Sequence, residues 1–369
     1  MTGKGLKLFL GGDLMTGRGI DQILPHPSPP DLYERWVQHA EDYVTLAVRR
    51  NGPIPRPVPF HYIWGDALAE LERQRPQLRL VNLETSVTRS ARYQPDKGIH
   101  YRMNPANVPC LTAAAIDCCV LANNHVLDWG EDGLVETLDV LERSSIAVAG
   151  AGRSAEAASQ PAILAAGPAG RLLVFAFGLA SSGIPATWAA KHEGPGINHL
   201  PDCSTAGAER VVAAVNAHRR EGDLVLVSIH WGGNWGYDIP PEHVEFAHRL
   251  VDEAGANVVH GHSSHHPMAV EVYRGRPVLY GCGDLLNDYE GIRGYEAFRS
   301  ELTFMYFPML DPTKGSLLEL VLTPMQIRRL RLEHCSEEDA RWLAERMREQ
   351  GSRFGTGVRE RDGRLHLEW

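Results

Sequence analysis

Leu121-Ala122-Asn123-Asn124-His125-Val126-Leu127-Asp128 is the stretch that decides the fold class of this chain. The apolar residues 117–121 predict a buried strand, and residues 131–144 predict an amphipathic helix. A turn from strand to helix that carries an amide, an imidazole and a carboxylate is typical of open α/β sheets, which place ligands at strand ends. Taken alone, the stretch has an ordinary alternative, because Asn and Asp are also common turn and N-cap residues.

Four other apolar runs end in side chains of the same kinds. The runs and the residues after them are 6–10 with Asp13, 78–81 with Glu84, 224–229 with His230, and 257–259 with His260, His262, His265 and His266. Each residue singly has an ordinary explanation in a turn or in the core. Five strand ends that all carry carboxylate, amide or imidazole groups are not explained in this way. The joint pattern therefore predicts a metal site.

Composition narrows the class of protein. The chain has 369 residues, 43% of them hydrophobic, and a net charge of −9, which gives no basic surface for nucleic acid. Its six cysteines show no Cys-x-x-Cys spacing and are expected to be buried and reduced. The first apolar run is too short for a signal peptide, and no run reaches the length of a membrane span. We expect a cytoplasmic protein with no membrane partner.

The order of predicted elements indicates one large domain with additions. Residues 1–312 are predicted to form the catalytic domain, and 313–369 an α+β extension packed on the core. Residues 22–66 look like an insertion, with a helix predicted from Asp31 to about Arg50. The insertion is either a lid over the ligands or plain decoration.

The ligand types indicate hydrolytic chemistry. Asp, Glu, Asn and His suit divalent transition ions such as Fe, Mn or Zn, and there are enough of them for two ions. A two-metal site activates water and holds both attacking and leaving oxygens. His125 is a candidate proton donor to the leaving group, and Asp128 is a candidate to orient its imidazole. Asp128 is equally suited to be an N-cap of the following helix.

The motifs resemble the CapA family, proteins linked to poly-γ-glutamate capsule synthesis that look like a branch of the calcineurin-like metallophosphoesterase superfamily. The resemblance covers about residues 6–310 and rests on Asp13, Asn82-Leu83-Glu84, Ala122-Asn123-Asn124-His125, Asp128-Trp129-Gly130, His230-Trp231-Gly232 and Gly261-His262-x-x-His265. It implies a four-layer α/β/β/α sandwich of the metallophosphoesterase type with an inserted helical segment. By position it implies Asp13 as a ligand and Glu84 as the bridging carboxylate. Asn124 and His230 would bind the second metal, and His125 would be the catalytic imidazole.

The chain departs from the superfamily pattern at several positions. Met15 stands where Asp-x-His has its imidazole, and the bridging carboxylate is a Glu rather than an Asp. The last motif, usually Gly-His-x-His, is lengthened here, so His260, His262 and His265 all stay candidate ligands. Asp284, in a turn after a predicted strand, is either another carboxylate near the site or a solvated turn residue.

Five further residues are candidates to contact substrate. Lys97, Tyr101 and Arg102 are suited to an anionic small molecule, or else belong to a surface turn. Trp231 and Trp235 follow a candidate ligand in a Gly-rich loop. They are candidates for an apolar wall, or else simply cover the sheet end.

Two functions follow from these observations. The first is a cytoplasmic dinuclear-metal hydrolase that uses a metal-bound hydroxide on a small ester, either a phosphoester or an acyl thioester such as acyl-CoA. The alternative is a non-catalytic CapA-like accessory protein that binds polyglutamate or a polymer-synthesis complex.

Overall fold

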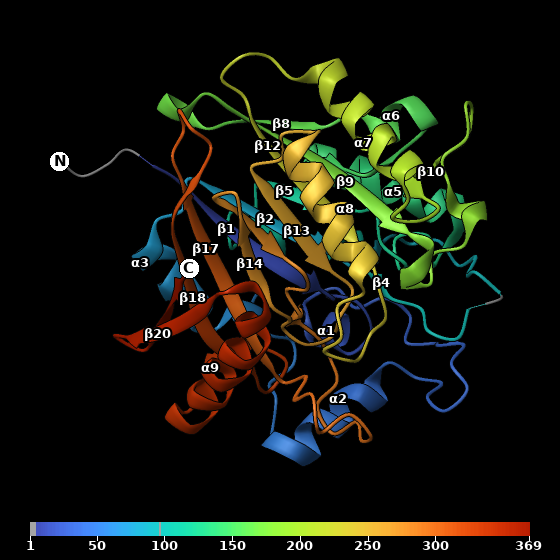
Figure 1. Ribbon diagram of the computed structural model, residues 1–369. Coiled ribbons are helices and arrows are strands. Elements are labelled where there is room, and N and C mark those ends of the chain that lie inside the picture. The colour runs from blue at the N-terminus through green and yellow to red at the C-terminus, as the bar shows by residue number, and fades with distance from the viewer. Residues whose placement is uncertain (1–4, 96) are drawn as a thin grey trace.

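The computed structural model describes residues 5–95 and 97–369 and shows a mixed α/β fold (Figure 1). The predicted α/β class is confirmed. Two large sheets form the centre of the molecule. The helices are α1 (Arg18–Ile23), α2 (Glu41–Asn51), α3 (Ala67–Gln74), α4 (Pro109–Thr112), α5 (Gly130–Arg143), α6 (Ala155–Ser159), α7 (Thr205–His218), α8 (Pro241–Asp252) and α9 (Glu337–Gly351).

The first sheet has the strand order β20-β21-β18-β17-β1-β2-β5-β6, with β16 beside β1 and β19 beside β18. The bounds are β1 (Leu6–Leu14), β2 (Leu78–Leu83), β5 (Cys118–Val120), β6 (Ala147–Ala149), β16 (Asp284–Leu286), β17 (Leu302–Leu310), β18 (Leu317–Ile327), β19 (Leu332–His334), β20 (Gly357–Arg361) and β21 (Arg364–Glu368). The strands β1, β2, β5 and β6 are parallel, so their carboxyl ends lie at one edge. The predicted strands at 6–10, 78–81 and 117–121 are confirmed.

The second sheet has the strand order β11-β9-β12-β13-β15-β14, with β8 beside β9. The bounds are β8 (Ala162–Ala165), β9 (Arg171–Leu179), β11 (His199–Leu200), β12 (Leu224–His230), β13 (Val258–His262), β14 (Val270–Tyr273) and β15 (Arg276–Leu279). Two short strand pairs lie outside both sheets, β3 (Ser86–Val87) with β4 (Arg102–Met103) and β7 (Ala151–Gly152) with β10 (Gly196–Ile197). The hairpins β8–β9 and β14–β15 are antiparallel.

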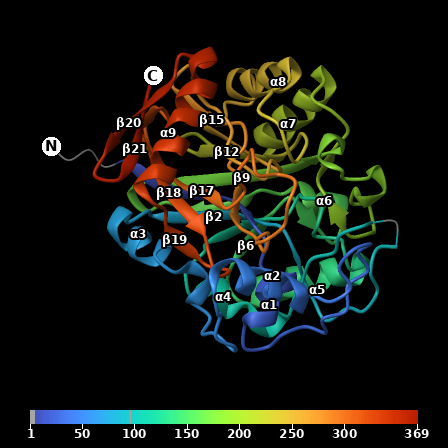
Figure 2. The ribbon, with the colours of Figure 1, turned by 90° about the horizontal axis from the view of Figure 1, so that it is seen from below.

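Three hydrophobic clusters arrange these elements in layers. The central cluster joins alternate residues of β1 and β2 to alternate residues of β9 and β12, so the two sheets face each other. An outer cluster packs α3, α4 and α5 on the first sheet, and another packs α7 and α8 on the second. Figure 2 shows α7 and α8 on one side of the strands and α1 to α5 on the other. Cys118 and Cys119 follow this alternation, one in each cluster of the first sheet.

The insertion contains a shorter helix than the sequence predicts. The helix α2 begins at Glu41, and residues 31–40 instead form a turn closed by a bridge between Asp31 and His39. The predicted helix from Asp31 is therefore wrong over its first ten residues. Glu34 is the physical reason, because it turns inward to pair with the buried guanidinium of Arg18.

The segment after residue 312 continues the first sheet. One long strand, β18, covers residues 317–327, and the short β19 is the next strand along the chain. The helix α9 begins at Glu337, after Ser336, whose hydroxyl accepts from the amide of Asp339. Within residues 5–95 and 97–369, no helix is long and apolar enough to cross a membrane. The cytoplasmic location stays a prediction.

Candidate metal centre

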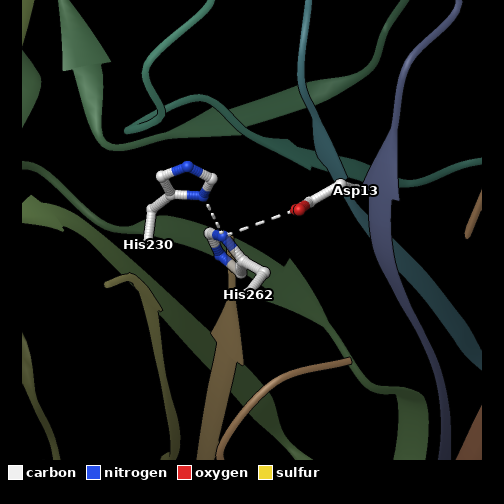
Figure 3. Close-up of side chains that lie close together, drawn as sticks. All are labelled: Asp13, His230 and His262. Atoms are coloured by element: carbon white, nitrogen blue, oxygen red, sulfur yellow. Dashed lines mark hydrogen bonds and ion pairs between the residues drawn. The ribbon is translucent and has the colours of Figure 1, made fainter. Parts of the chain in front are cut away.

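The predicted ligands converge where strands of the two sheets end. Asp13 is the penultimate residue of β1, and His230 and His262 are the last residues of the neighbouring strands β12 and β13. Figure 3 shows these three side chains pointing toward one another from different strands. Parallel strands place their carboxyl ends together, and here two facing sheets do so at the same point.

Two groups of possible ligands share Asp13. Ligand atoms of Asp13, His230 and His262 lie within 4.8 Å of one another, and so do those of Asp13, His265 and Asp284. The second group forms because β1 pairs in parallel with β16, with Asp13 opposite Asp284. The close approach requires glycine at position 12, where a Cβ would lie 1.8 Å from the carbonyl oxygen of Gly283.

The Asp13 carboxylate is held by its surroundings. Its Oδ1 accepts from the amide of Asn82 at 2.7 Å, and its Oδ2 accepts from the backbone N–H of Ser263 at 3.2 Å. Ser263 has a φ of 103°, a conformation that costs energy for a residue with a side chain. This strained backbone fixes the turn between His262 and His265 with its amide toward Asp13.

Glu84 lies at the border between the first group and His125. Its two oxygens are 4.0 Å from Nδ1 of His230 and 3.8 Å from Nε2 of His125. The resemblance implies Glu84 as the bridging carboxylate, whereas the two compact groups of this structure share Asp13. Glu84 is therefore a ligand candidate beside the groups, close to both His230 and His125.

The structure distinguishes among the histidines of the 260–266 segment. Nδ1 of His262 lies 2.7 Å from Nδ1 of His230, and Nδ1 of His265 lies 2.8 Å from Asp284. His260, a predicted ligand, is placed away from both groups. Its Nε2 contacts the carbonyl of Gly11 at 3.0 Å and its Nδ1 the hydroxyl of Ser228 at 3.0 Å, because its side chain points between the sheets.

Asn124 reaches the first group through an imidazole. Its Oδ1 lies 3.1 Å from Nε2 of His230, so the amide accepts the hydrogen of that ring. Nδ1 of His230 is thereby directed toward His262. In this arrangement the Asn124 amide orients His230, a candidate ligand.

Burial has the largest influence on the pKa values of the candidate ligands. Burial and the neighbouring Asp284 raise the pKa of Asp13 to about 7, and burial and Asp13 raise the pKa of Glu84 well above its usual range. Burial also holds the pKa values of His230 and His262 well below the usual value, which favours neutral rings. For His265 burial lowers the pKa, but the carboxylates of Asp284 and Asp13 together reverse this effect and raise it. Neutral imidazoles and closely spaced carboxylates are the donor set that divalent cations take.

His125 lies beside the two ligand groups and contacts Asp128 and Lys97 through its Nδ1. Its Nδ1 lies 2.7 Å from Asp128, whose carboxylate also accepts from the backbone N–H of Tyr101. The ammonium of Lys97 donates to Asp128 and to the carbonyl of Asn124. Burial lowers the pKa of His125 to about 4, with Asp128 opposing and Lys97 adding to that effect. The imidazole is thus oriented through Nδ1 and presents Nε2 toward Glu84.

The predicted substrate residues separate into two sets. Lys97 lies at the His125–Asp128 pair, the Tyr101 ring packs edge-on against His125 at 4.6 Å, and Trp235 packs 5.2 Å from His265. Arg102 and Trp231 are not brought to the cluster. Arg102 donates to the carbonyls of Pro29 and Ser90, and Trp231 is buried in the outer core with its Nε1 donating to Tyr280.

Asp284, which the sequence left open as either a carboxylate near the site or a solvated turn residue, is buried and completes the second group. Its signal was the Gly-Asp turn after a strand, the same pattern as at Asp13. Two further residues of the centre were absent from the predicted set. Ser228, a polar residue within an apolar run, contacts two rings of the cluster. Arg18 is buried between Asp288 and Glu34 and lies over the ring of Tyr101 at 4.2 Å. No local pattern in the sequence indicates that contact.

The fold and the two ligand groups define an α/β protein with buried carboxylate and imidazole side chains, of the kinds that bind metals, at the carboxyl ends of its strands. The family model described as "Bacterial capsule synthesis protein PGA_cap" matches residues 7–289. This chain belongs to that family, and the recognised CapA family is confirmed. Kinship with the metallophosphoesterase superfamily stays a prediction.

Three of the similar proteins have names that refer to polymer or capsule synthesis. A probable polyglutamine synthesis accessory protein of Mycobacterium tuberculosis is 46% identical over 97% of this chain and 94% of its own length. The PGA biosynthesis protein CapA of Bacillus subtilis is 29% identical over 56% of this chain and 52% of its own length. The capsule biosynthesis protein CapA of Bacillus anthracis is 24% identical over 52% of this chain and 45% of its own length.

Proposed function

We propose that this protein is an accessory protein in the synthesis of a glutamate- or glutamine-based polymer and works through a buried divalent-metal centre with hydrolase chemistry. The polymer context is supported by the names of its relatives. The metal centre is supported by one observation above all, the two ligand groups that share the buried carboxylate of Asp13.

The residues fit two divalent transition ions such as Fe, Mn or Zn. Asp13, His230 and His262 would hold one ion, and Asp13, His265 and Asp284 the other. Bound ions would activate water and polarise the scissile group. Buried carboxylates this close repel one another, so a cation at the centre would also remove an electrostatic cost of the fold.

The other residues of the site suit a small anionic ester, either a phosphoester or an acyl thioester. His125, held through Nδ1 by Asp128, would take a proton from the attacking water onto Nε2 and pass it to the leaving group. The ammonium of Lys97 supplies positive charge beside this imidazole. Tyr101 keeps the ring in place from the other side.

The second candidate is a non-catalytic accessory protein that binds polyglutamate or a polymer-synthesis complex. The names of the relatives favour it, because they describe accessory and biosynthesis proteins rather than hydrolases. In this case the metal centre would have a structural or ligand-binding role.

Turnover by the metal-loaded protein separates the two candidates. The substrates would be p-nitrophenyl phosphate, bis(p-nitrophenyl) phosphate and a series of acyl-CoA thioesters, with metal content measured on the same samples. We expect metal-dependent turnover that His125→Gln removes without loss of metal. His248→Gln is the matched control, because this imidazole pairs with Glu271 away from the centre. Full metal occupancy with no turnover of any ester, together with binding of polyglutamate, would favour the non-catalytic candidate.

A further inference from the structure

The histidine that joins neither ligand group has a defined place in a chain of hydrogen bonds. His260 is 1% exposed and lies behind His262. Contacts of 3.0 Å, 3.0 Å and 2.8 Å link the carbonyl of Gly11 to His260, His260 to the hydroxyl of Ser228, and Ser228 to Nε2 of His262. This series of hydrogen bonds therefore begins at a backbone acceptor, the carbonyl oxygen of Gly11, and ends at a candidate metal ligand, His262.

We propose that Ser228 and His260 are positioning residues that fix the tautomer of His262, so that its Nδ1 carries a lone pair facing the centre. This inference rests on the proposed metal site and concerns only residues of this chain. It assigns a role to the extra histidine of the His260-x-His262 pattern.

Which atom donates in each of these hydrogen bonds follows from which atoms can carry a hydrogen and which can only accept one. A carbonyl oxygen only accepts, so Nε2 of His260 carries hydrogen and donates to Gly11. The contacts of this buried ring include no carboxylate that would support a second hydrogen, so Nδ1 of His260 has none and accepts from the Ser228 hydroxyl. The Ser228 oxygen then accepts, and Nε2 of His262 must donate to it. The opposite direction would require a charged His260 in the core.

The contacts of His230 select the same tautomer, with the hydrogen on Nε2. Nε2 of His230 lies 3.1 Å from Oδ1 of Asn124, an acceptor, so its hydrogen is on Nε2. The two Nδ1 atoms, 2.7 Å apart, then face each other with lone pairs, and Oδ1 of Asp13 lies 3.8 Å from that of His262 (Figure 3). Two lone pairs and a carboxylate directed at one point repel one another unless a cation lies there.

The tautomer can be measured in the metal-free protein, independently of any activity. Long-range ¹H–¹⁵N spectra of histidine-labelled protein at pH 7.5 distinguish hydrogen on Nδ1 from hydrogen on Nε2, and the His262→Gln spectrum assigns the signal. We expect the Nε2–H form for His262 in the wild type and a mixture of the two forms in Ser228→Ala. A wild-type His262 with its hydrogen on Nδ1 would overturn the proposal.

Metal affinity gives the second readout. We expect Ser228→Ala to weaken binding of Zn²⁺, measured by competition with a chelator, by about 10–100-fold, the usual effect of losing a partner behind a ligand. Ser228→Thr keeps the hydroxyl and should restore both affinity and tautomer. Ser182→Ala is the matched control, because this buried hydroxyl donates to the carbonyls of Leu179 and His230 and touches no ring nitrogen.

The outcomes separate this inference from the proposed function. A wild type that binds no Zn²⁺ or Mn²⁺ would refute the proposed metal centre, whatever the spectra show. A wild type that binds metal, with Ser228→Ala within about threefold of it and showing the same His262 tautomer, would refute the positioning role alone. If Ser228→Ala does not fold, the wild-type spectrum and the Ser228→Thr affinity still decide the matter.

Discussion

Asp13→Asn is expected to stabilise the metal-free protein and to remove its stabilisation by metal. Burial and Asp284 raise the pKa of Asp13 from 3.8 to about 7 in the folded state. This carboxyl therefore contributes stability below about pH 3.8, and that stability is lost as the pH rises to about 7. The change corresponds to roughly 4 kcal/mol. An amide at this position carries no charge and avoids that loss.

The substitution has a smaller opposing effect. Asp13 accepts from both Asn82 and Ser263, and Asn has only one acceptor oxygen, so one hydrogen bond is lost at about 1–2 kcal/mol. We expect the metal-free variant to exceed the wild type by about 2–3 kcal/mol at pH 8 and to equal it near pH 5. With metal at 100 times the dissociation constant, the wild type should gain about 2.7 kcal/mol and the variant nothing, because both groups contain Asp13.

Urea denaturation at pH 5 and pH 8, with chelator and with Mn²⁺ or Zn²⁺, measures all of these differences. Asp21→Asn is the control, because Asp21 is a fully buried carboxyl with a raised pKa whose partners, Ser28, Asn104 and Asn107, lie outside the ligand groups. Its response to metal should equal that of the wild type. An Asp13→Asn variant that is less stable than the wild type at pH 8 without metal, or that keeps the full gain with metal, would refute the shared role of Asp13.

Three further variants test other parts of the site. His125→Gln should keep its metal and lower kcat for any hydrolysed ester by about 10²–10⁴-fold, and an unchanged kcat would exclude proton transfer by this ring. Lys97→Met removes the ammonium that donates to Asp128, so KM for anionic esters should rise more than kcat falls; an unaltered KM would contradict a role in attracting the substrate. Arg18→Met leaves the buried Asp288 unpaired and should cost about 3–5 kcal/mol in urea denaturation, whereas a cost under about 1 kcal/mol would refute its role as a buried anchor.

The sequence predicted the strand ends because burial and the placement of polar groups are local signals. The run Leu224–Ile229 is apolar on both faces because its strand has a core on each side, and the next residue, His230, begins the polar edge. The same pattern located Asp13 and Glu84. Composition and spacing along the chain therefore carry most of the information about where this centre lies.

The parts that the sequence did not predict depend on contacts between distant segments. The register that places Asp284 opposite Asp13 comes from the pairing of β1 with β16, which are separated by most of the chain. The helix predicted from Asp31 is wrong over residues 31–40 because Glu34 turns inward to meet Arg18, while Trp36, two residues later, is 83% exposed. A buried ion pair outweighed a helical periodicity that the sequence shows clearly.

The departures from the superfamily pattern are consistent with one rearrangement of the second ligand group. Met15 supplies no imidazole and is fully buried, but its backbone N–H donates to the carbonyl of Leu286 at 2.9 Å. That hydrogen bond holds β16 along β1 and brings Asp284, with His265 attached at 2.8 Å, to Asp13. The lengthened turn that contains Ser263 gives His265 the reach to arrive there. On the predicted superfamily pattern, His265 would take the place of the imidazole missing after β1, and the second group would then consist of residues that the usual spacing does not select.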